Sequence, residues 1–136
     1  MLNGVIIGKL RNLDEVIGEL RSLGPLTTER LATEWVVRRA VERCLRVGVE
    51  IVLDVCHRIL ALSGKTPAAT SREAIEDCVA LGVLSRLEPY GEMVGFRNMV
   101  VHRYDRIDPN VLVDITNNHL QDFDRFRDEV LAYCAQ

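Results

Sequence analysis

The chain has 136 residues, a hydrophobic content of 48% and a formal net charge of −3 at pH 7. These values predict one globular domain over residues 1–136 with a hydrophobic core of its own. The acidic balance and an aromatic content of only 5% argue against a protein that coats nucleic acid broadly or stacks many bases. They leave room for one small cationic cleft.

The sequence also indicates in which cellular compartment the protein is found. No apolar run approaches the length of a membrane span, and the first residues lack the pattern of a secretory leader. The cysteines are scattered and form no CxxC pair, which is typical of reduced thiols and not of a zinc site or a disulfide framework. We therefore expect a cytoplasmic protein without a membrane, metal or cofactor. The cysteines are Cys44, Cys56, Cys78 and Cys134.

Helical periodicity begins near the start of the chain. Apolar residues step by 4, 3, 4 and 3 along an amphipathic first helix that Gly24-Pro25 ends; they are Ile6, Leu10, Leu13, Ile17 and Leu20. A second helix is predicted from about residue 28 to 63, which is roughly 50 Å at 1.5 Å per residue. Its apolar seam is Leu45, Gly48, Val52, Val55, Ile59 and Leu62. Because so long a rod cannot be covered by one small bundle, we expect part of it to meet a second subunit.

Capping patterns predict the remaining helices. Thr70-x-x-Glu73 opens a short third helix, and Ser85-x-x-Glu88 opens a fourth. Asp108-Pro109 places an N-cap aspartate before a first-turn proline and starts the last helix. The apolar stripe of that helix is Leu112, Ile115, Phe123, Phe126, Val130 and Tyr133. No strand-like alternation is present, so the fold class is an all-α, up-and-down antiparallel bundle of about five helices.

The chemistry concentrates in residues 97–104, Arg-Asn-Met-Val-Val-His-Arg-Tyr, on the fourth predicted helix. At 100° per residue Arg97 falls inside the apolar arc, where a cation needs a compensating carboxylate, subunit cleft or phosphate. Asn98 and His102 are neighbours at i and i+4, and Tyr104 lies two turns beyond Arg97. Arg97 and His102, at i and i+5, do not stack within one helix. They suit phosphoryl chemistry across a groove or with a second copy.

The residues alone also allow plainer interpretations. Arg97 could form a structural ion pair with a carboxylate such as Glu92 or one from another helix. His102 could be a capping or solvent-facing helix histidine, and Asn98 a surface amide. Tyr104 by itself is typical of the edge of a core.

The motif closely resembles that of the HEPN superfamily, and within it the HepT-like toxins, whose motif is Arg, four residues, His, one residue, Tyr. The match covers residues 93–104 with Ile107-Asp108, and it extends to residues 70–74 and 120–123. Arg103 departs from relatives, in which the residue between His and Tyr is often acidic. The resemblance implies an all-helical homodimer with two motif helices facing a shared cleft.

The resemblance further implies a metal-independent endoribonuclease, the toxin of a type VII-like HEPN/MNT toxin–antitoxin pair. Arg97 and His102 would be catalytic, Asn98 would support them, and a cognate MNT-type nucleotidyltransferase antitoxin would silence the toxin by AMP transfer to Tyr104. An alternative of a different class is a non-catalytic helical subunit that binds substrate or nucleotide for a nucleotidyltransferase.

Other polar residues are expected to have structural roles. Asp54 and His57 resemble half of a metal site but have no second pair to complete it, so a surface ion pair is expected. His119 falls near the stripe of the last helix and is predicted to be a core histidine. Trp35 is predicted to anchor the core or a dimer. Residues 38–46 carry four arginines and are predicted to form a solvated face, with a secondary possibility of guiding RNA.

Overall fold

The computed structural model describes residues 3–102 and 107–136, and within them the protein is all-helical. The prediction of an all-α fold is confirmed, although the described residues form seven helices and not about five. The elements are α1 (Gly4–Ser22), α2 (Thr28–Thr33), α3 (Trp35–Leu62), α4 (Ser71–Leu81), α5 (Tyr90–His102), α6 (Pro109–Asn118) and α7 (Gln121–Cys134).

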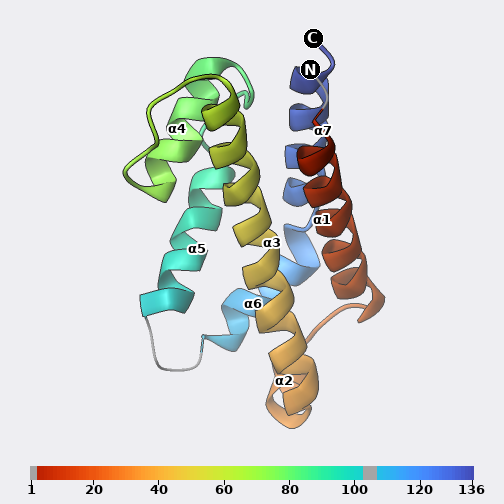
Figure 1. Ribbon diagram of the computed structural model, residues 1–136. Helices are drawn as coiled ribbons and strands as arrows, with labels where there is room; N and C mark the ends of the chain where they lie inside the picture. Colours follow the sequence, from red (N-terminus) through yellow and green to blue (C-terminus); the bar gives the residue numbers. More distant parts are fainter. Residues whose placement is uncertain (1–2, 103–106) are drawn as a thin grey trace.

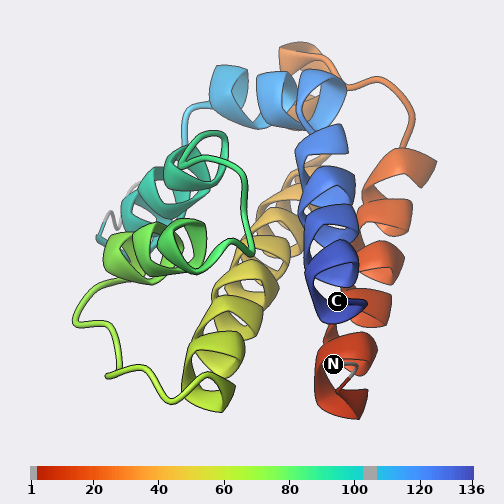
Figure 2. The same cartoon turned by 90° about the horizontal axis from the view of Figure 1, so that it is seen from above.

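α3 is the central element of the bundle. Figures 1 and 2 show α1 and α7 on one side of it and α4 and α5 on the other, while α2 and α6 close one end. The two ends of the chain lie close together at the opposite end of the bundle. α3 therefore contributes to the packing of both halves, and its exposed surface lies between them.

α1 forms as its periodicity predicts. All five residues of its predicted seam are buried. The Asn3 side chain accepts hydrogen bonds from the backbone N–H groups of Val5 and Ile6, at 2.9 and 3.2 Å, and so satisfies donors that the first turn leaves free. Gly24, with a φ of 73°, turns the chain after the helix.

The long second helix that the sequence predicts is in fact two helices. α2 ends at Thr33, Glu34 leaves helical geometry with φ −115° and ψ 83°, and α3 begins at Trp35. α2 is held across the end of the bundle by Leu31, which is buried, and by Arg30, which donates to the Leu23 carbonyl at 2.6 Å. The helix thus breaks at a position that no proline or glycine marks. α3 is about 42 Å long.

The predicted seam of α3 is buried except at its end, where Leu62 is 52% exposed. Gly48 is the point of closest approach to α7. A Cβ added there would lie 3.3 Å from a ring carbon of Phe123 and 3.7 Å from Ile17. The absence of a side chain therefore lets α3 pack directly against an aromatic ring of α7.

The capping predictions have mixed outcomes. Thr70 caps α4 by accepting from the N–H of Glu73 at 3.1 Å, as expected. The Ser85 capping box is wrong, because α5 begins only at Tyr90 and the Ser85 N–H donates to Glu129 of α7 at 3.1 Å. Ser85 is thus engaged by another helix and does not start its own.

The last predicted helix is divided as well. Asp108 caps α6 by accepting from Asn110 N–H at 2.9 Å, which confirms the predicted start. α6 ends at Asn118, and α7 begins at Gln121. Asn117 binds both backbone groups of Leu26, its N–H at 2.9 Å and its carbonyl at 2.8 Å, and so fastens α6 across the end of the bundle. Of the predicted stripe, Ile115 and Tyr133 are only half-buried.

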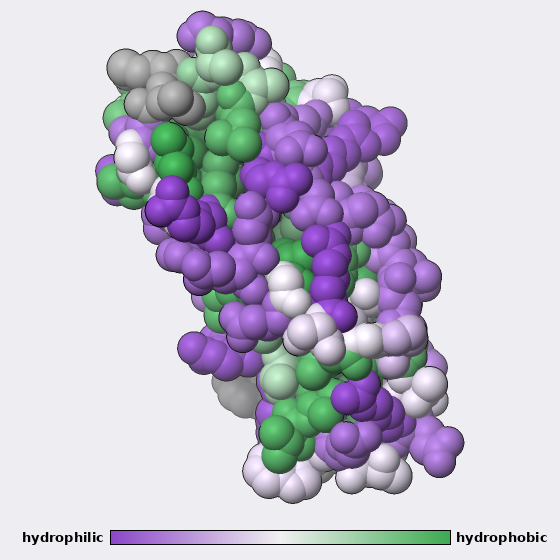
Figure 3. Space-filling model, turned by 90° about the vertical axis from the view of Figure 1, so that its right-hand side faces the viewer, coloured by the Kyte–Doolittle hydropathy of each residue, from purple (hydrophilic) through white to green (hydrophobic). Residues whose placement is uncertain are grey.

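The surface formed by α1 and α7 is mainly hydrophilic, with apolar residues gathered toward its two ends (Figure 3). Ion pairs cross between these helices: Arg127 and Asp14 lie 2.8 Å apart, and Arg21 and Asp124 lie 2.5 Å apart. Within residues 3–102 and 107–136 no helix is long and apolar enough to cross a membrane. The four cysteines are free thiols.

Candidate active site

α5 carries the motif, and its first residue fixes it to the bundle. Tyr90 is fully buried, and its ring meets Phe126 of α7 edge to face at 5.6 Å. The Tyr90 hydroxyl donates a short hydrogen bond to the Glu129 carboxylate, which also accepts from the N–H of Ser85. This network, which the sequence did not reveal, ties the start of α5 to α7.

Burial and the bond to Glu129 raise the pKa of Tyr90 well above its ordinary value, so its hydroxyl stays a donor. Burial alone would raise the pKa of Glu129, but hydrogen bonds from Ser85 and Tyr90 outweigh it and lower that pKa. The carboxylate therefore stays charged and keeps its two donors at neutral pH.

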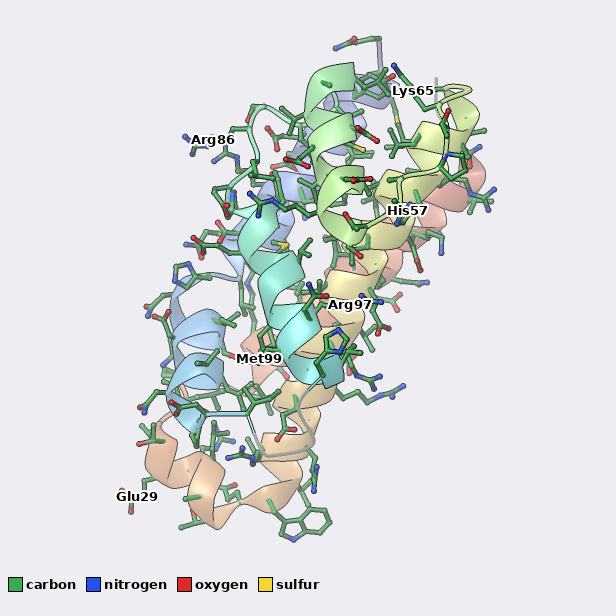
Figure 4. The ribbon with its side chains drawn as sticks, turned by 90° about the vertical axis from the view of Figure 1, so that its left-hand side faces the viewer. Glu29, His57, Lys65, Arg86, Arg97 and Met99 are labelled. Carbon is green, nitrogen blue, oxygen red and sulfur yellow. The ribbon has the colours of Figure 1, made fainter. Side chains whose placement is uncertain are left out.

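Arg97 lies at the edge of the apolar side of α5 and not inside it as predicted, because Val101, expected to flank it, is 49% exposed. Met93, Val94 and Phe96 are buried around it, and Arg97 itself is half-buried. Its Nε is enclosed and has no hydrogen-bond partner among the described residues. The alternative of a structural ion pair, with Glu92 or with a carboxylate of another helix, is not seen among the described residues. Figure 4 shows Arg97 between α5 and α3, on the face that also carries His57.

Asn98 and His102 are both exposed near the end of α5. No hydrogen bond joins the Asn98 amide to the His102 imidazole within the described ranges, so Asn98 does not orient the ring here. Tyr104, the predicted modification target, lies outside the described residues.

Arg97 and His102 do not meet within one chain. His102 is five positions after Arg97, which corresponds to about 140° around the helix. One copy therefore presents a half-buried cation and an exposed imidazole in different directions. A reacting phosphate could touch both kinds of group only if a second surface supplied one of them.

A further arginine, Arg38 of α3, holds the chain just beyond the motif. It is 6% exposed, forms an ion pair with Glu42 at 2.9 Å and donates to the Ile107 carbonyl at 2.5 Å. The prediction of a solvated face is wrong at this position, although Arg39 and Arg43 of the same stretch are exposed. The i, i+4 spacing of Arg38 and Glu42 was a signal for the ion pair, but not for the bond to Ile107.

On the other flank of α5 is a largely apolar cavity of about 280 Å³, which contains neither Arg97 nor His102. His119 lies at its rim and corrects a prediction: its side chain is 46% exposed, not in the core. Its ring nitrogens lie 3.3 Å from Asp114 and 3.6 Å from Asp122. The turn between α6 and α7 moved this residue out of the stripe.

The structure also bears on the predictions for Asp54, His57 and Trp35. Asp54 pairs with Lys9 of α1 at 3.6 Å and not with a residue of its own helix. His57 is exposed, and in the described part of the chain no three metal-ligating side chains gather. Trp35 is 71% exposed, so it is not a core residue.

We compared the sequence and the fold with those of known proteins. A family model described as "Ribonuclease HepT-like" matches residues 13–130. The mRNA nuclease HepT of Shewanella oneidensis is 22% identical over 136 residues, covering 96% of this chain and 99% of the relative. The fold resembles that of a tri-AMPylated Shewanella oneidensis HEPN toxin in complex with MNT antitoxin, with a TM-score of 0.86, 21% identity and coverage of 96% and 99%. It also resembles a toxin–antitoxin structure with AMP-PNP, with a TM-score of 0.84, 21% identity and the same coverage.

Proposed function

The chain belongs to the HepT-like ribonuclease family, and from this premise we propose a metal-independent endoribonuclease toxin whose composite site uses Arg97 and His102 from two copies. The family model confirms the prediction of a HepT-like ribonuclease and the similar structures confirm the fold, while the names of the similar proteins support a role in a toxin–antitoxin pair. The site residues, the homodimer and the absence of a metal are our own proposals.

One observation carries the proposal: Arg97 keeps an enclosed guanidinium nitrogen without a partner among the described residues, a turn and a half from an exposed His102. A half-buried cation without a carboxylate is costly unless an anion completes it. An RNA phosphate is such an anion, and the exposed imidazole of His102 from a second copy is the group best suited to move protons to and from it near neutral pH.

The chemistry follows from two copies of the pair. One His102 takes the proton of the ribose 2′-hydroxyl, and the freed oxygen attacks phosphorus. The bond to the 5′-oxygen breaks, and the second His102 gives that oxygen a proton. Arg97 neutralises the charge that builds on the phosphorane. The products would be a 2′,3′-cyclic phosphate and a free 5′-hydroxyl. Asn98, which is exposed beside His102, would donate to the phosphate.

The decisive experiment compares matched substitutions on labelled RNA in excess EDTA. Arg97→Ala and His102→Ala should each lower the cleavage rate by about 10²-fold or more. Arg86→Ala and His57→Ala, which change exposed residues outside the site, should cleave at the wild-type rate. Equal cleavage by all variants would indicate a contaminating nuclease. Absence of cleavage in every sample, wild type included, would favour the binding-subunit alternative.

We extend the proposal to control by a partner. The similar toxin structure is described as AMPylated and in complex with an MNT antitoxin. For this chain, the Tyr104 phenol oxygen would attack the α-phosphorus of ATP on a cognate nucleotidyltransferase, with pyrophosphate leaving. The added phosphate would then compete with RNA for Arg97.

Intact mass measured after incubation with that partner, ATP and magnesium tests this extension. The wild type and the control Tyr133→Phe should gain one or more AMP groups, and Tyr104→Phe should gain none while staying toxic on co-expression. AMP on the Tyr104→Phe variant would exclude this residue as the acceptor.

A further inference from the structure

A row of arginines follows the exposed side of α3. Arg39 and Arg43 are exposed, and Arg46 is half-buried. Their spacing of four and three residues places them on one side of the helix, about 6 Å and about 5 Å apart along its axis. Trp35 stands one turn before Arg39. These four residues are called the α3 stripe below.

The charges of the stripe are not balanced locally. None of its three arginines has a carboxylate within 4.0 Å in the part of the chain that the structure describes. Glu42 is the only acidic residue among positions 35–47, and it is taken by Arg38. Like charges at this spacing repel one another. A chain with a net charge of −3 thus maintains one concentrated positive strip, which fits a polyanion.

The aromatic end of the stripe adds a second feature. Trp35 is 71% exposed and Val36 is 61% exposed. Beside the indole is a hollow of about 220 Å³ lined by Leu31, Ala32, Trp35, Arg38 and Arg39. An exposed aromatic ring with a guanidinium next to it is a stacking site for a flat base whose phosphate meets the cation.

The stripe begins close to the end of the motif helix. α3 packs against α5, and Arg38 bonds to the carbonyl of Ile107, five residues beyond His102. In Figure 4 the last turns of α5 lie over the middle part of α3, with which α5 is in contact. Arg39 of the stripe therefore lies one residue along α3 from a side chain that binds the chain shortly after the motif helix.

We propose that the α3 stripe binds single-stranded RNA and leads it to the site on α5, with a base stacked on Trp35 and successive phosphates on Arg39, Arg43 and Arg46. The choice of RNA as the polyanion rests on the proposed ribonuclease function. Stacking of a base on one ring and contact with the RNA backbone depend little on the base sequence. The stripe would therefore set the affinity for RNA and the path of the strand, and not the sequence at which the RNA is cleaved.

The salt dependence of RNA binding distinguishes the contribution of the three arginines from that of Trp35. A labelled single-stranded RNA is titrated in EDTA with full-length protein carrying His102→Ala, so that the RNA stays intact. Adding Arg39→Gln, Arg43→Gln and Arg46→Gln together should weaken binding and reduce the slope of log affinity against log salt by about 2. Adding Trp35→Ala should weaken binding about tenfold and leave the slope unchanged. Arg58→Gln, an exposed arginine farther along α3, is the matched control and should bind as the parent does.

Unchanged affinity and slope in the triple variant would overturn the inference. So would a Trp35→Ala variant that separates copies of the chain in light scattering without loss of RNA affinity, because the stripe would then be a protein interface. The proposed function is judged separately. Wild-type protein that binds through the stripe but never cleaves RNA would refute the ribonuclease and support the stripe. Cleavage with stripe-independent binding would do the reverse.

Discussion

The two sides of the bundle use arginine differently. Where α1 meets α7, Arg21 and Arg127 each bind carboxylates of the neighbouring helix, at 2.5 and 2.8 Å. On the side of α3 and α5, the arginines of the α3 stripe and Arg97 have no carboxylate partner among the described residues.

Arg21 and Arg127 thus join two helices, whereas Arg97 and the arginines of the α3 stripe remain able to bind an anion. A paired arginine adds little to stability when exposed, but it satisfies its own charge. An unpaired arginine that is partly desolvated does not contribute to the stability of the folded protein through its charge. We therefore expect substitutions on the α1–α7 side to change stability alone, and substitutions at Arg97 to change activity alone.

The sharpest test of this contrast is Arg97→Met. Methionine keeps an unbranched apolar stem but removes the guanidinium, whose Nε is enclosed without a partner. RNA cleavage should fall by about 10²-fold or more, while the melting temperature stays the same or rises. Cleavage assays and thermal unfolding followed by circular dichroism measure both. A fall of more than about 4 °C would place Arg97 among the structural arginines.

Adjacent arginines on α3 offer a second test. Arg38→Met removes the donor to the Ile107 carbonyl and to Glu42, so the free energy of unfolding should fall by about 1–3 kcal/mol. Arg39→Met changes an exposed side chain and should stay within about 0.5 kcal/mol of the wild type. Urea titration distinguishes them, and equal losses would contradict the division between buried and exposed arginines.

A third test uses pH. The pKa of Glu129 is lowered in the folded protein, so its contribution to stability is present above the ordinary glutamate value of 4.5 and is lost as pH falls through the folded value. Glu129→Gln cannot titrate, but its amide has one acceptor oxygen where the carboxylate has two, so it keeps only one of the acceptors for the Ser85 N–H and the Tyr90 hydroxyl and is expected to be less stable at neutral pH. Between about pH 5 and 3 the wild-type melting temperature should fall more steeply than that of the variant. Glu15→Gln, an exposed control, should follow the wild type.

The smallest effect is expected on the paired side. Arg127→Ala removes the ion pair with Asp14, whose side chain is 46% exposed. The free energy of unfolding should change by no more than about 1 kcal/mol, and the difference should shrink in 1 M salt. RNA cleavage should equal that of the wild type. A large loss of cleavage would show that the paired arginines also serve the site.

Local pattern predicted much of this protein. The seam of α1, the cap at Thr70 and the start at Asp108 all follow from residues within a few turns of each other. Each depends on helical geometry or on a cap that its own segment supplies. The motif and its neighbours were also sufficient to identify the family.

Only the tertiary structure decided features that depend on residues far apart in the chain. Asn117 binds Leu26 just before the turn at His119, and Glu129 binds Ser85 where periodicity would have begun α5; both contacts join residues more than 40 positions apart. The same holds for Arg38, whose i, i+4 glutamate was visible in the sequence but whose contact with Ile107 was not. Hydrophobic spacing records which side of a helix is buried. It does not record which distant backbone group will meet a side chain, and that pairing separates the structural arginines of this protein from those left open to an anion.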